Sequence, residues 1–423
     1  MEERGLTMKP DRITRLIKGV FILLLLVTGC SEERITGTGD DGDNDSPATL
    51  ERRVSRNNRF AIDLYRQLAL SEDSNFIFCP HSISTIFGMA YAGARGGTER
   101  QIADVLGFNY PPQGFHSELS HLNSLIENRA GTEIDINNGC WIDNDYYYQQ
   151  EYLDTISACY QAEVDSVDFT GHPEEARLLI NDWAHDNCGI SNLFPPGSID
   201  ALTFMVLVNT MKLSASWADQ FDPDFTYSDI FTRLGGSTIN VDYMCGESNK
   251  SFFSGTGFQA LELPFEEQNI SMVLILPDPG NFNQFETELS PVAIDTIFAN
   301  MQVNWVRMDI PKFIIWSEYS LIGTMKDMGL TLPFSQGANF SGIDGVDDGT
   351  PWVNALVHKS EIWVDEYGVE ASAATGMGLT IGESACFRAN RPFIFLIRDM
   401  ETGAILFMGR VVYPFHFGGS RQY

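Results

Sequence analysis

The sequence predicts a mixed α+β fold, and three observations lead to that prediction. Apolar residues recur at helical spacing through the first third of the chain, which indicates helices with one buried face. Short apolar runs bounded by turn residues follow later, as in buried strands. The chain has 423 residues, 43% hydrophobic and only 20% charged, which is enough apolar material for one large core.

The first elements are expected to be helices. Two stretches carry apolar side chains every three to four residues: Phe60, Ala61, Leu64, Tyr65 and Leu68, then Ile83, Ile86, Phe87 and Ala90. We expect Ser82 to cap the second of these helices. Thr98 and Gln101 have the spacing of a capping box at the start of a third helix.

Four later runs predict buried strands, at residues 204–208, 272–276, 393–397 and 405–412. Turn residues at 399–403 would connect the last two runs as a C-terminal hairpin. No Pro/Gly/Ser linker or charge run divides the chain between Arg53 and Pro414. We therefore expect a single domain over residues 51–415, followed by a C-terminal tail at 416–423.

Residues 366–387 have the features of both a loop and a strand. Glycines interrupt this segment, as in an exposed connection. Every second residue is nevertheless small or apolar, which is the pattern of a strand with one buried face: Val369, Ala371, Ala373, Thr375, Met377, Leu379 and Ile381. The segment is therefore a candidate switch, and the alternative is an ordinary edge strand or a low-complexity loop.

Several motifs occur in the order and at the separations of one known superfamily. They lie at residues 75–84, 92–98, 207–210 with Trp217 and 221–223, 310–313, 357–376, 387–395 and 407–411. On these motifs the chain resembles the serpins, the serine-protease-inhibitor superfamily, from about Arg53 to Pro414. An ordered set of motifs is a much stronger signal than one short pattern.

The resemblance implies a serpin fold, in which helices surround a large, mostly antiparallel-edged sheet A and two smaller sheets. It also implies an exposed reactive-centre loop at residues 366–387 and a mechanical protease inhibitor. A protease attacks a bond in the loop, and the cut loop then inserts into the main sheet as an extra strand before the acyl-enzyme hydrolyses. The protease is carried along and its active site is distorted.

The resemblance assigns a hinge to the start of the loop. Its residues are Glu366, Gly368, Val369, Glu370, Ala371, Ser372, Ala373, Ala374 and Thr375. Insertion buries alternate residues, so a large or charged side chain on the buried face would slow insertion relative to deacylation. No residue on that face forbids burial. The family usually has Thr or Ser where this chain has Val369, which is similarly small and β-branched.

The family's usual hinge length puts the reactive bond between Gly382 and Glu383. Bonds next to it, at Thr380, Ile381 and Ser384, stay open as alternatives. Small and apolar residues here suggest an elastase-like or subtilisin-like serine protease as the target, with a cysteine protease as an alternative. A cut after Glu383 would instead suggest a glutamate-preferring protease.

The resemblance also assigns Ser82, Asn209 and His358 to the region where the main sheet opens, with side chains that would form a polar network under the central strands. Trp217 matches a tryptophan at the top of that sheet. Singly, a buried His or Trp usually just packs, so these residues gain meaning from occurring together in order. They would control opening and catalyse nothing.

The first thirty residues predict export. Basic residues precede an apolar run at 20–27 that is too short to span a bilayer, so residues 1–29 are expected to be a signal peptide. The residues up to Cys30 resemble a bacterial lipoprotein processing box, which implies cleavage before Cys30 and lipidation of its thiol. The alternative is a cleaved leader with a chance cysteine. Met1 and Met8 both stay open as the start.

Residues 30–50 are expected to be a lipidated cysteine followed by a disordered acidic tether, because aspartates lie among glycines with almost nothing apolar. The resemblance to bacterial lipoproteins places the exported chain at the cell envelope, held to the membrane through its lipid. Ser31 follows Cys30 where an Asp often signals inner-membrane retention. This favours the outer membrane or cell surface.

The composition limits which classes of binding partner are expected. The formal net charge of -30 argues against nucleic acid and anionic membrane surfaces, and we expect a monomer. The cysteines after Cys30 are Cys79, Cys140, Cys159, Cys188, Cys245 and Cys386. Their spacing shows no metal pattern and leaves the disulfide connectivity open. Most are expected to be buried small hydrophobes, with Cys386 as the candidate exception.

Catalysis by this chain is not expected. The sequence has no Gly-x-Ser-x-Gly elbow, His-Glu-x-x-His motif, phosphate loop or dinucleotide fingerprint, so we expect no cofactor and no metal. Two other functions stay open. One is a non-inhibitory serpin-fold binding or carrier protein whose loop is cut without trapping anything, and the other is a lipid-anchored surface-interaction protein with the fold as a scaffold. The small hinge favours inhibition over both.

Overall fold

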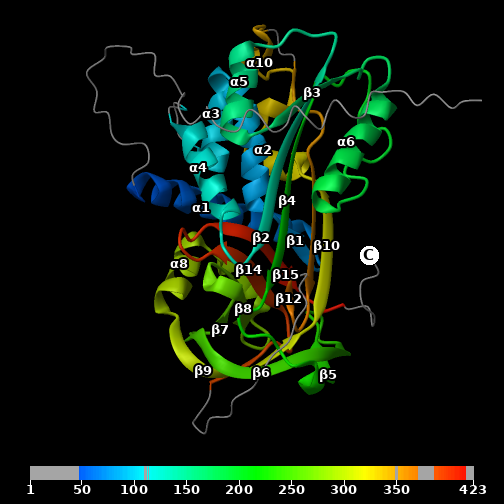
Figure 1. Ribbon diagram of the computed structural model, residues 1–423. Coiled ribbons are helices and arrows are strands. Elements are labelled where there is room, and N and C mark those ends of the chain that lie inside the picture. The colour runs from blue at the N-terminus through cyan, green and yellow to red at the C-terminus, as the bar shows by residue number, and fades with distance from the viewer. Residues whose placement is uncertain (1–46, 109–111, 113, 348–350, 370–384, 416–423) are drawn as a thin grey trace, which may run out of the picture. The chain divides into compact units, whose positions relative to one another are not determined.

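The computed structural model describes residues 47–108, 112, 114–347, 351–369 and 385–415 (Figure 1). The helices are α1 (Pro47–Ser71), α2 (Pro80–Gly93), α3 (Gly96–Leu106), α4 (Phe115–Glu127), α5 (Gln150–Tyr160), α6 (Pro173–Cys188), α7 (Phe282–Glu288), α8 (Pro291–Asn300), α9 (Ile322–Asp327) and α10 (Ser341–Asp344). Residues 1–46 and 416–423 lie outside this part, and so do the predicted signal peptide, Cys30, most of the predicted tether and the predicted C-terminal tail.

The strands complete the mixed α+β class, which is confirmed. They are β1 (Phe76–Phe78), β2 (Glu133–Asp143), β3 (Glu163–Val167), β4 (Met205–Ser216), β5 (Tyr227–Thr232), β6 (Thr238–Gly255), β7 (Phe258–Pro264), β8 (Ile270–Pro277), β9 (Gln302–Pro311), β10 (Phe313–Ser320), β11 (Val357–Val364), β12 (Gly368–Val369), β13 (Ala385–Arg388), β14 (Phe393–Asp399) and β15 (Ile405–Val411). The four strand predictions fall on β4, β8, β14 and β15, and the last two pair as the expected hairpin.

Two sheets hold the described strands. The first is six-stranded, in the order β10-β11-β12-β4-β2-β3, and its one parallel pair among the described ladders is β2 with β3 at the edge. The second is nine-stranded, because β6 pairs in turn with β5, β9 and β7 along its length. The two smaller sheets expected from the sequence are therefore continuous through β6.

Both faces of the six-stranded sheet are covered, because side chains of β4 alternate between them. Leu207 points to the side of α2, whose Ile83 and Phe87 lie in the same core cluster. Val206 and Val208 point the other way and pack with residues of α6. Figure 1 shows α6 alongside the long strands. Anything that enters this sheet must therefore lie between α2 and α6.

The two predicted helix caps are wrong. Helix α2 begins at Pro80, which suits the first position of a helix because it has no N–H to satisfy. Its cap is Cys79, whose thiol accepts a hydrogen bond from the backbone N–H of Ser82. Helix α3 begins at Gly96, so Thr98 lies inside its first turn.

The side chains of the expected capping box bind another segment instead. The hydroxyl oxygen of Thr98 accepts a hydrogen bond from the backbone N–H of Asn339 at 2.8 Å. The carboxamide oxygen of Gln101 accepts from the backbone N–H groups of Thr331 and Leu332. The two residues therefore hold a later segment of the chain against α3.

Helix α1 reaches further toward the N-terminus than the sequence suggested. It begins at Pro47, so residues 47–50 of the predicted tether are helical. Leu50 is partly buried against the core, which explains why the helix extends this far. In the part of the chain that the structure describes, no helix is both long enough and apolar enough to cross a membrane.

Candidate functional site

The candidate site is a gap in the middle of the six-stranded sheet. Strand β12 has two residues and lies between β11 and β4, with Val369 opposite Val364 on one side and Ala215 on the other. Both ladders are antiparallel. Past Val369, in the direction in which the chain continues and which we call below β12, no described ladder joins β11 directly to β4. We call the space between these two strands the slot.

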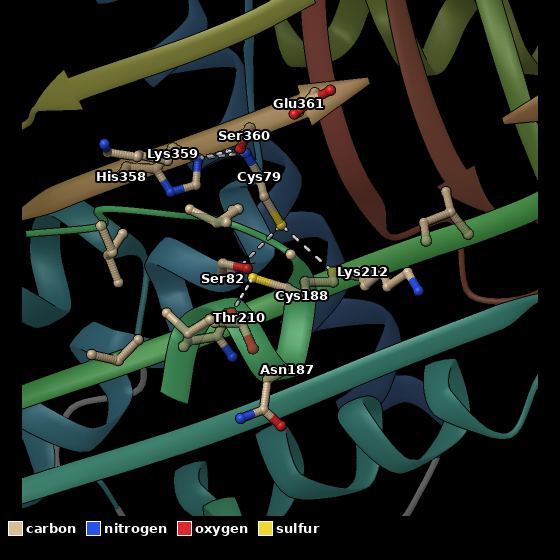
Figure 2. Close-up of a pocket in the computed structure, with 18 of the residues that line it drawn as sticks. Cys79, Ser82, Asn187, Cys188, Thr210, Lys212, His358, Lys359, Ser360 and Glu361 are labelled. Carbon is tan, nitrogen blue, oxygen red and sulfur yellow. Dashed lines mark hydrogen bonds between the residues drawn. The ribbon is translucent and has the colours of Figure 1, made fainter. Parts of the chain in front are cut away.

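The slot is a cavity of about 610 Å³ (Figure 2). Strands β4 and β11 form its sides, with residues from Leu207 to Leu213 and from Val357 to Ile362. Ser82 and Ile86 of α2 and Cys79 just before that helix line one face of the slot, and residues at the end of α6, including Cys188, line the other. The slot is thus enclosed front and back by helices and open along the sheet.

The dimensions of the slot suit one more strand. Neighbouring strands lie about 4.8 Å apart, so two strands that both pair with β12 are about 10 Å apart at that point. Below β12 the facing edges of β4 and β11 have no ladder between them. Unpaired backbone groups at a strand edge are a template for another strand. A strand that continued from β12 would pair with both edges at once.

The hinge residues that the structure describes are tightly held. Gly368 has a φ of 147°, and a Cβ there would lie 2.1 Å from the carbonyl oxygen of Ala215. Only glycine fits so close to β4. Val369 follows and is 3% exposed, in the core cluster that also contains Ala215 and Val364. The first residue of the predicted buried face is therefore already packed in the sheet.

Glu366 anchors the chain just before β12. Its carboxylate lies 2.9 Å from Nζ of Lys312 and accepts a hydrogen bond of 2.7 Å from the hydroxyl of Thr226. Its own carbonyl accepts from the backbone N–H of Phe221. Burial alone would raise the pKa of Glu366, but the contacts with Thr226 and Lys312 outweigh it and lower that pKa. The carboxylate is therefore held in its charged form.

Trp217 lies at the same end of the sheet and fixes the backbone of the hinge. Its ring stacks on Phe265 with centroids 4.7 Å apart, and it is 3% exposed. Its indole N–H donates to the carbonyl of Asp365, and its backbone N–H donates to the carbonyl of Tyr367. The residue picked from the sequence thus contacts the two residues that flank Glu366.

Ser82, Asn209 and His358 all line the slot (Figure 2 labels Ser82 and His358). Among the described residues, however, no hydrogen bond joins their side chains to one another. Nε2 of His358 accepts from the backbone N–H of Cys79 at 3.0 Å and lies 2.9 Å from the hydroxyl of Ser360. Burial lowers the pKa of His358 to about 4, so the ring is neutral near pH 7.

Asn209 has a different partner on β2. Its amide Nδ2 donates to Oδ1 of Asn138 at 3.0 Å. Its own Oδ1 is buried and has no hydrogen-bond partner among the described residues. A buried acceptor without a partner is costly, and it lies where an added strand would pass. Cys79, Asn138 and Ser360 were not selected from the sequence, because a single small polar residue carries no distinctive pattern.

Several predicted site residues lie outside the described part of the chain. These are Glu370, Ala371, Ser372, Ala373, Ala374 and Thr375 of the hinge, and Thr380, Ile381, Gly382, Glu383 and Ser384 around the predicted reactive bond. The chain is described again from β13, which pairs with β9 in the other sheet. Cys386 on β13 is exposed, Cys79 and Cys140 are buried, and all six described cysteines are free thiols.

Comparisons with known proteins agree with this architecture. Residues 55–414 match the family described as Serpin (serine protease inhibitor). The chain belongs to the serpin family, whose members are mostly protease inhibitors and not enzymes. The serpin fold expected from the sequence is thereby confirmed.

Two relatives illustrate the range of the match. An uncharacterized serpin-like protein of Thermococcus kodakarensis is 34% identical, over 85% of each chain. Antithrombin-III of Mus musculus is 33% identical, over 91% of this chain and 87% of its own. Both alignments extend across nearly the whole domain.

Solved structures give the same result. Human thyroxine-binding globulin in complex with thyroxine superimposes with a TM-score of 0.79 at 28% identity, covering 87% of this chain and all of the other. A loop-inserted structure of a cleaved ovalbumin mutant superimposes with a TM-score of 0.79 at 25% identity, covering 86% of this chain and all of the other.

Proposed function

We propose that this serpin is a suicide inhibitor of a protease, and that its cut reactive loop inserts between β4 and β11. The single observation that carries the proposal is the slot. It begins directly below β12, is enclosed by α2 and α6, and has two strand edges facing each other with no ladder between them. The cleaved ovalbumin mutant similar to this chain is described as loop-inserted, which supports the same destination here.

The ladders of β12 set the register that an inserted strand would follow. Because both ladders are antiparallel, each step of two residues along the loop moves two residues back along β4 and along β11. Ala371 would then lie between Leu213 and Ile362. Ala373 would lie between Met211 and Ser360. Thr375 would lie between Asn209 and His358.

The side chains along this register are compatible with burial. Leu213 and Ile362 are buried apolar residues, so the methyl group of Ala371 would meet a matching surface. Ala373 is small enough to pass Ser360, which is 6% exposed. No charged side chain would be buried on this face over these positions.

The polar position of the register has polar neighbours. The hydroxyl of Thr375 can donate one hydrogen bond and accept another. It would meet Oδ1 of Asn209, a buried acceptor with no described partner, and the ring of His358. Insertion would therefore satisfy a group that is unsatisfied beforehand, which favours the inserted state. Asn209 and His358, which the sequence assigned to sheet opening, would thus contact the inserted strand.

Inhibition depends on whether the loop inserts faster than the acyl-enzyme is hydrolysed. After the protease cuts the loop, the new strand gains two ladders and buries one apolar face. If this is faster than hydrolysis of the acyl bond, the protease stays attached to the inserted strand. If it is slower, the protease leaves and the chain is only a substrate.

The target is proposed to be a serine protease, with a cysteine protease as the less favoured choice. The matched family description, serine protease inhibitor, supports the first. The small and apolar residues before the predicted bond, such as Ile381 and Gly382, favour elastase-like or subtilisin-like specificity. We further propose that the protein is an exported bacterial lipoprotein anchored through Cys30, at the outer membrane or cell surface, and that it is a monomer.

One observation favours a second candidate, a non-inhibitory binding or carrier protein. The fold is similar to thyroxine-binding globulin, whose structure was solved with thyroxine bound. A carrier would be cut in its loop without retaining the protease. The small residues of the hinge argue against it, because they suit rapid insertion.

The test is a panel of serine and cysteine proteases mixed with the protein and separated on denaturing gels. Inhibition predicts a covalent adduct with at least one protease, larger than either partner. The same protease with its catalytic nucleophile blocked is the matched control and should give none. Cleavage of the loop by every protease without any adduct would support the carrier function and contradict inhibition.

A further inference from the structure

Two oppositely charged side chains face each other across the slot, and the insertion step described above assigns neither of them a role. Lys212 lies on β4 and Glu361 on β11, and both line the slot (Figure 2). The ladders of β12 put them at the same level. Val369 pairs with Ala215 on one side and with Val364 on the other. Three residues back along each of these strands are Lys212 and Glu361. We call these two residues the rim pair.

The rim pair projects from the face of the sheet that carries α6. Successive side chains of a strand point to opposite faces. Lys212 lies an even number of residues from Val208, which packs with α6. Glu361 lies an odd number of residues from His358, whose ring contacts the residue before α2 on the opposite face. Burial raises the pKa of the Cys188 thiol at the end of α6, and the ammonium group of Lys212 opposes that rise, so the two groups are close.

Lys212 is the lysine of this face that is still available to a carboxylate across the slot. Within the residues that the structure describes, no ion pair or hydrogen bond reaches its ammonium group. Asp135 of β2 lies opposite Lys212 in the ladder on its other side. The second lysine, Lys359, is already engaged, because its ammonium group lies 2.8 Å from the carboxylate of Glu318 and donates to the carbonyl of Asn192 at 2.6 Å.

An inserted strand would lie between the two members of the rim pair without keeping their charged groups apart. The Cα atoms of the strands on either side of it would be about 10 Å apart. A lysine ammonium group reaches about 6 Å from its Cα, and a glutamate carboxylate reaches about 5 Å. The inserted residue at this level would be Ser372, which has a small side chain. The two charged groups can therefore meet above the inserted strand.

We propose that the rim pair forms an ion pair over the inserted strand and thereby stabilises the inserted state. The inference rests on the insertion step of the proposed function, because only an inserted strand lies between these two residues. The rim pair positions the strand and does not act on the bond that the protease attacks. Lys212 is only partly exposed beside the end of α6, so the ion pair is screened less than a fully exposed one.

A double-mutant cycle measures the ion pair. Lys212→Met, Glu361→Gln and the double variant are compared with the unmodified protein, and each is unfolded in denaturant before and after the loop is cut. Coupling between the two side chains should change the unfolding equilibrium constant of the cut form about fivefold, and that of the uncut form less than about twofold. The effect of Asp135 cancels, because this residue is present in all four proteins.

Charge reversal tests the consequence for retention of the protease. Lys212→Glu and Glu361→Lys should each lower the ratio of retained to released protease about threefold, because like charges then meet over the inserted strand. The double reversal should return the ratio to within about twofold of the unmodified protein. The exposed ion pair of Arg59 with Asp63 on α1 is the matched control, and Arg59→Asp with Asp63→Arg should leave the ratio unchanged.

The two measurements keep the outcomes distinct. Equal coupling in the cut and uncut forms would overturn the role of the rim pair and leave inhibition standing. Greater retention by the single reversals would also overturn it, because the pair would then be holding the slot closed before cleavage. If the unmodified protein retains no protease but the coupling still appears on cleavage, inhibition fails and the rim pair stands. If cleavage does not stabilise the unmodified protein, insertion fails and both are overturned.

Discussion

The carboxylate of Glu366 lies 2.9 Å from the ammonium group of Lys312, and this ion pair fixes the chain two residues before the hinge strand β12. The side chains are 5% and 19% exposed, so neither charge is well solvated. Trp217 holds the neighbouring residues Asp365 and Tyr367 through their carbonyls. The end of the slot next to β12 is therefore held in place by these contacts.

We predict that Glu366→Ala destabilises the uncut protein by about 2–3 kcal/mol, because it leaves the ammonium of Lys312 buried without its partner. Denaturant unfolding at pH 7 measures the loss. Lys312→Met and the double variant complete a mutant cycle, and the double variant should be more stable than Glu366→Ala alone. A loss below about 0.5 kcal/mol would show that the pair behaves like an exposed one.

We predict that Val369→Arg turns the inhibitor into a substrate while the protein still folds. Val369 is 3% exposed between Ala215 and Val364 in the uncut chain, so an arginine there would move β12 out of the sheet instead of burying its charge. Insertion would then have no hinge strand to extend. The fraction of cut chains that retain protease should fall more than about tenfold. Val369→Thr is the control and should retain inhibition, since Thr has nearly the same shape. Full trapping by Val369→Arg would count against insertion.

We predict that Thr375→Val reduces the gain in stability that follows loop cleavage. In the proposed register the hydroxyl of Thr375 meets Oδ1 of Asn209, which has no partner among the described residues. Valine has the same shape but leaves that acceptor unsatisfied, at a cost of about 1–3 kcal/mol in the cut form. The uncut form should unfold as before. If Thr375→Val and the unmodified protein gain equally on cleavage, the register is wrong.

We predict that acid weakens the uncut protein partly through His358. Burial lowers the pKa of His358 to about 4, below the value of about 6.5 in an unfolded chain. Between these values the unfolded chain binds the extra proton, so this contribution is complete above about pH 6.5 and is lost as the pH falls toward 4. It amounts to about 3 kcal/mol.

The variant His358→Gln tests this pH dependence, because glutamine can still accept a hydrogen bond from the N–H of Cys79 but takes up no proton. Cys79 and Ser360, the residues that contact the ring, are uncharged in this range. Unfolding free energies measured from pH 4 to 7 should fall less steeply for the variant. Burial also lowers the pKa values of His81 and His116 to about 4, so the unfolding free energy of the variant should still fall in part as the pH decreases. An unchanged slope would mean that His358 is not protonated on unfolding.

We predict that Cys30→Ser abolishes lipid attachment. In a bacterial host, metabolic labelling with a fatty acid should mark the unmodified protein and not the variant, and only the unmodified protein should partition with membranes. Cys386→Ser is the matched control, because Cys386 is an exposed thiol far along the chain and should leave labelling unchanged. Equal labelling of the Cys30 variant would contradict the anchor.

The positions of the main strands and of the hinge could be predicted from the sequence, because several motifs occur in the order of one family. Apolar runs located β8, β14 and β15, and the motif with His358 and Val369 lies on the two strands that meet at the hinge. Helix caps were not predictable, because Ser82 and Thr98 have the right residue type but lie inside the first turn. Their hydrogen bonds depend on where Pro80 and Gly96 start the helices.

The interior of the site was the least predictable part. No pattern in the sequence indicated that Glu366 pairs with Lys312, since they lie far apart in the chain and an isolated Glu or Lys carries no signal. The partner of Asn209 on β2 depends on the register of two strands, which only the folded chain fixes. The sequence indicates which polar residues belong to the site, but not which side chains on distant strands pair with them.

A structure of this protein after a protease has cut the loop would show whether the loop enters the slot. Strand insertion predicts that β12 extends through residues 370–379 and pairs along this length with both β4 and β11, so that the sheet keeps its six strands. Ala371 should then lie beside Leu213, and Thr375 between Asn209 and His358. A cut form in which residues 370–379 remain outside and β11 pairs directly with β4 would contradict it.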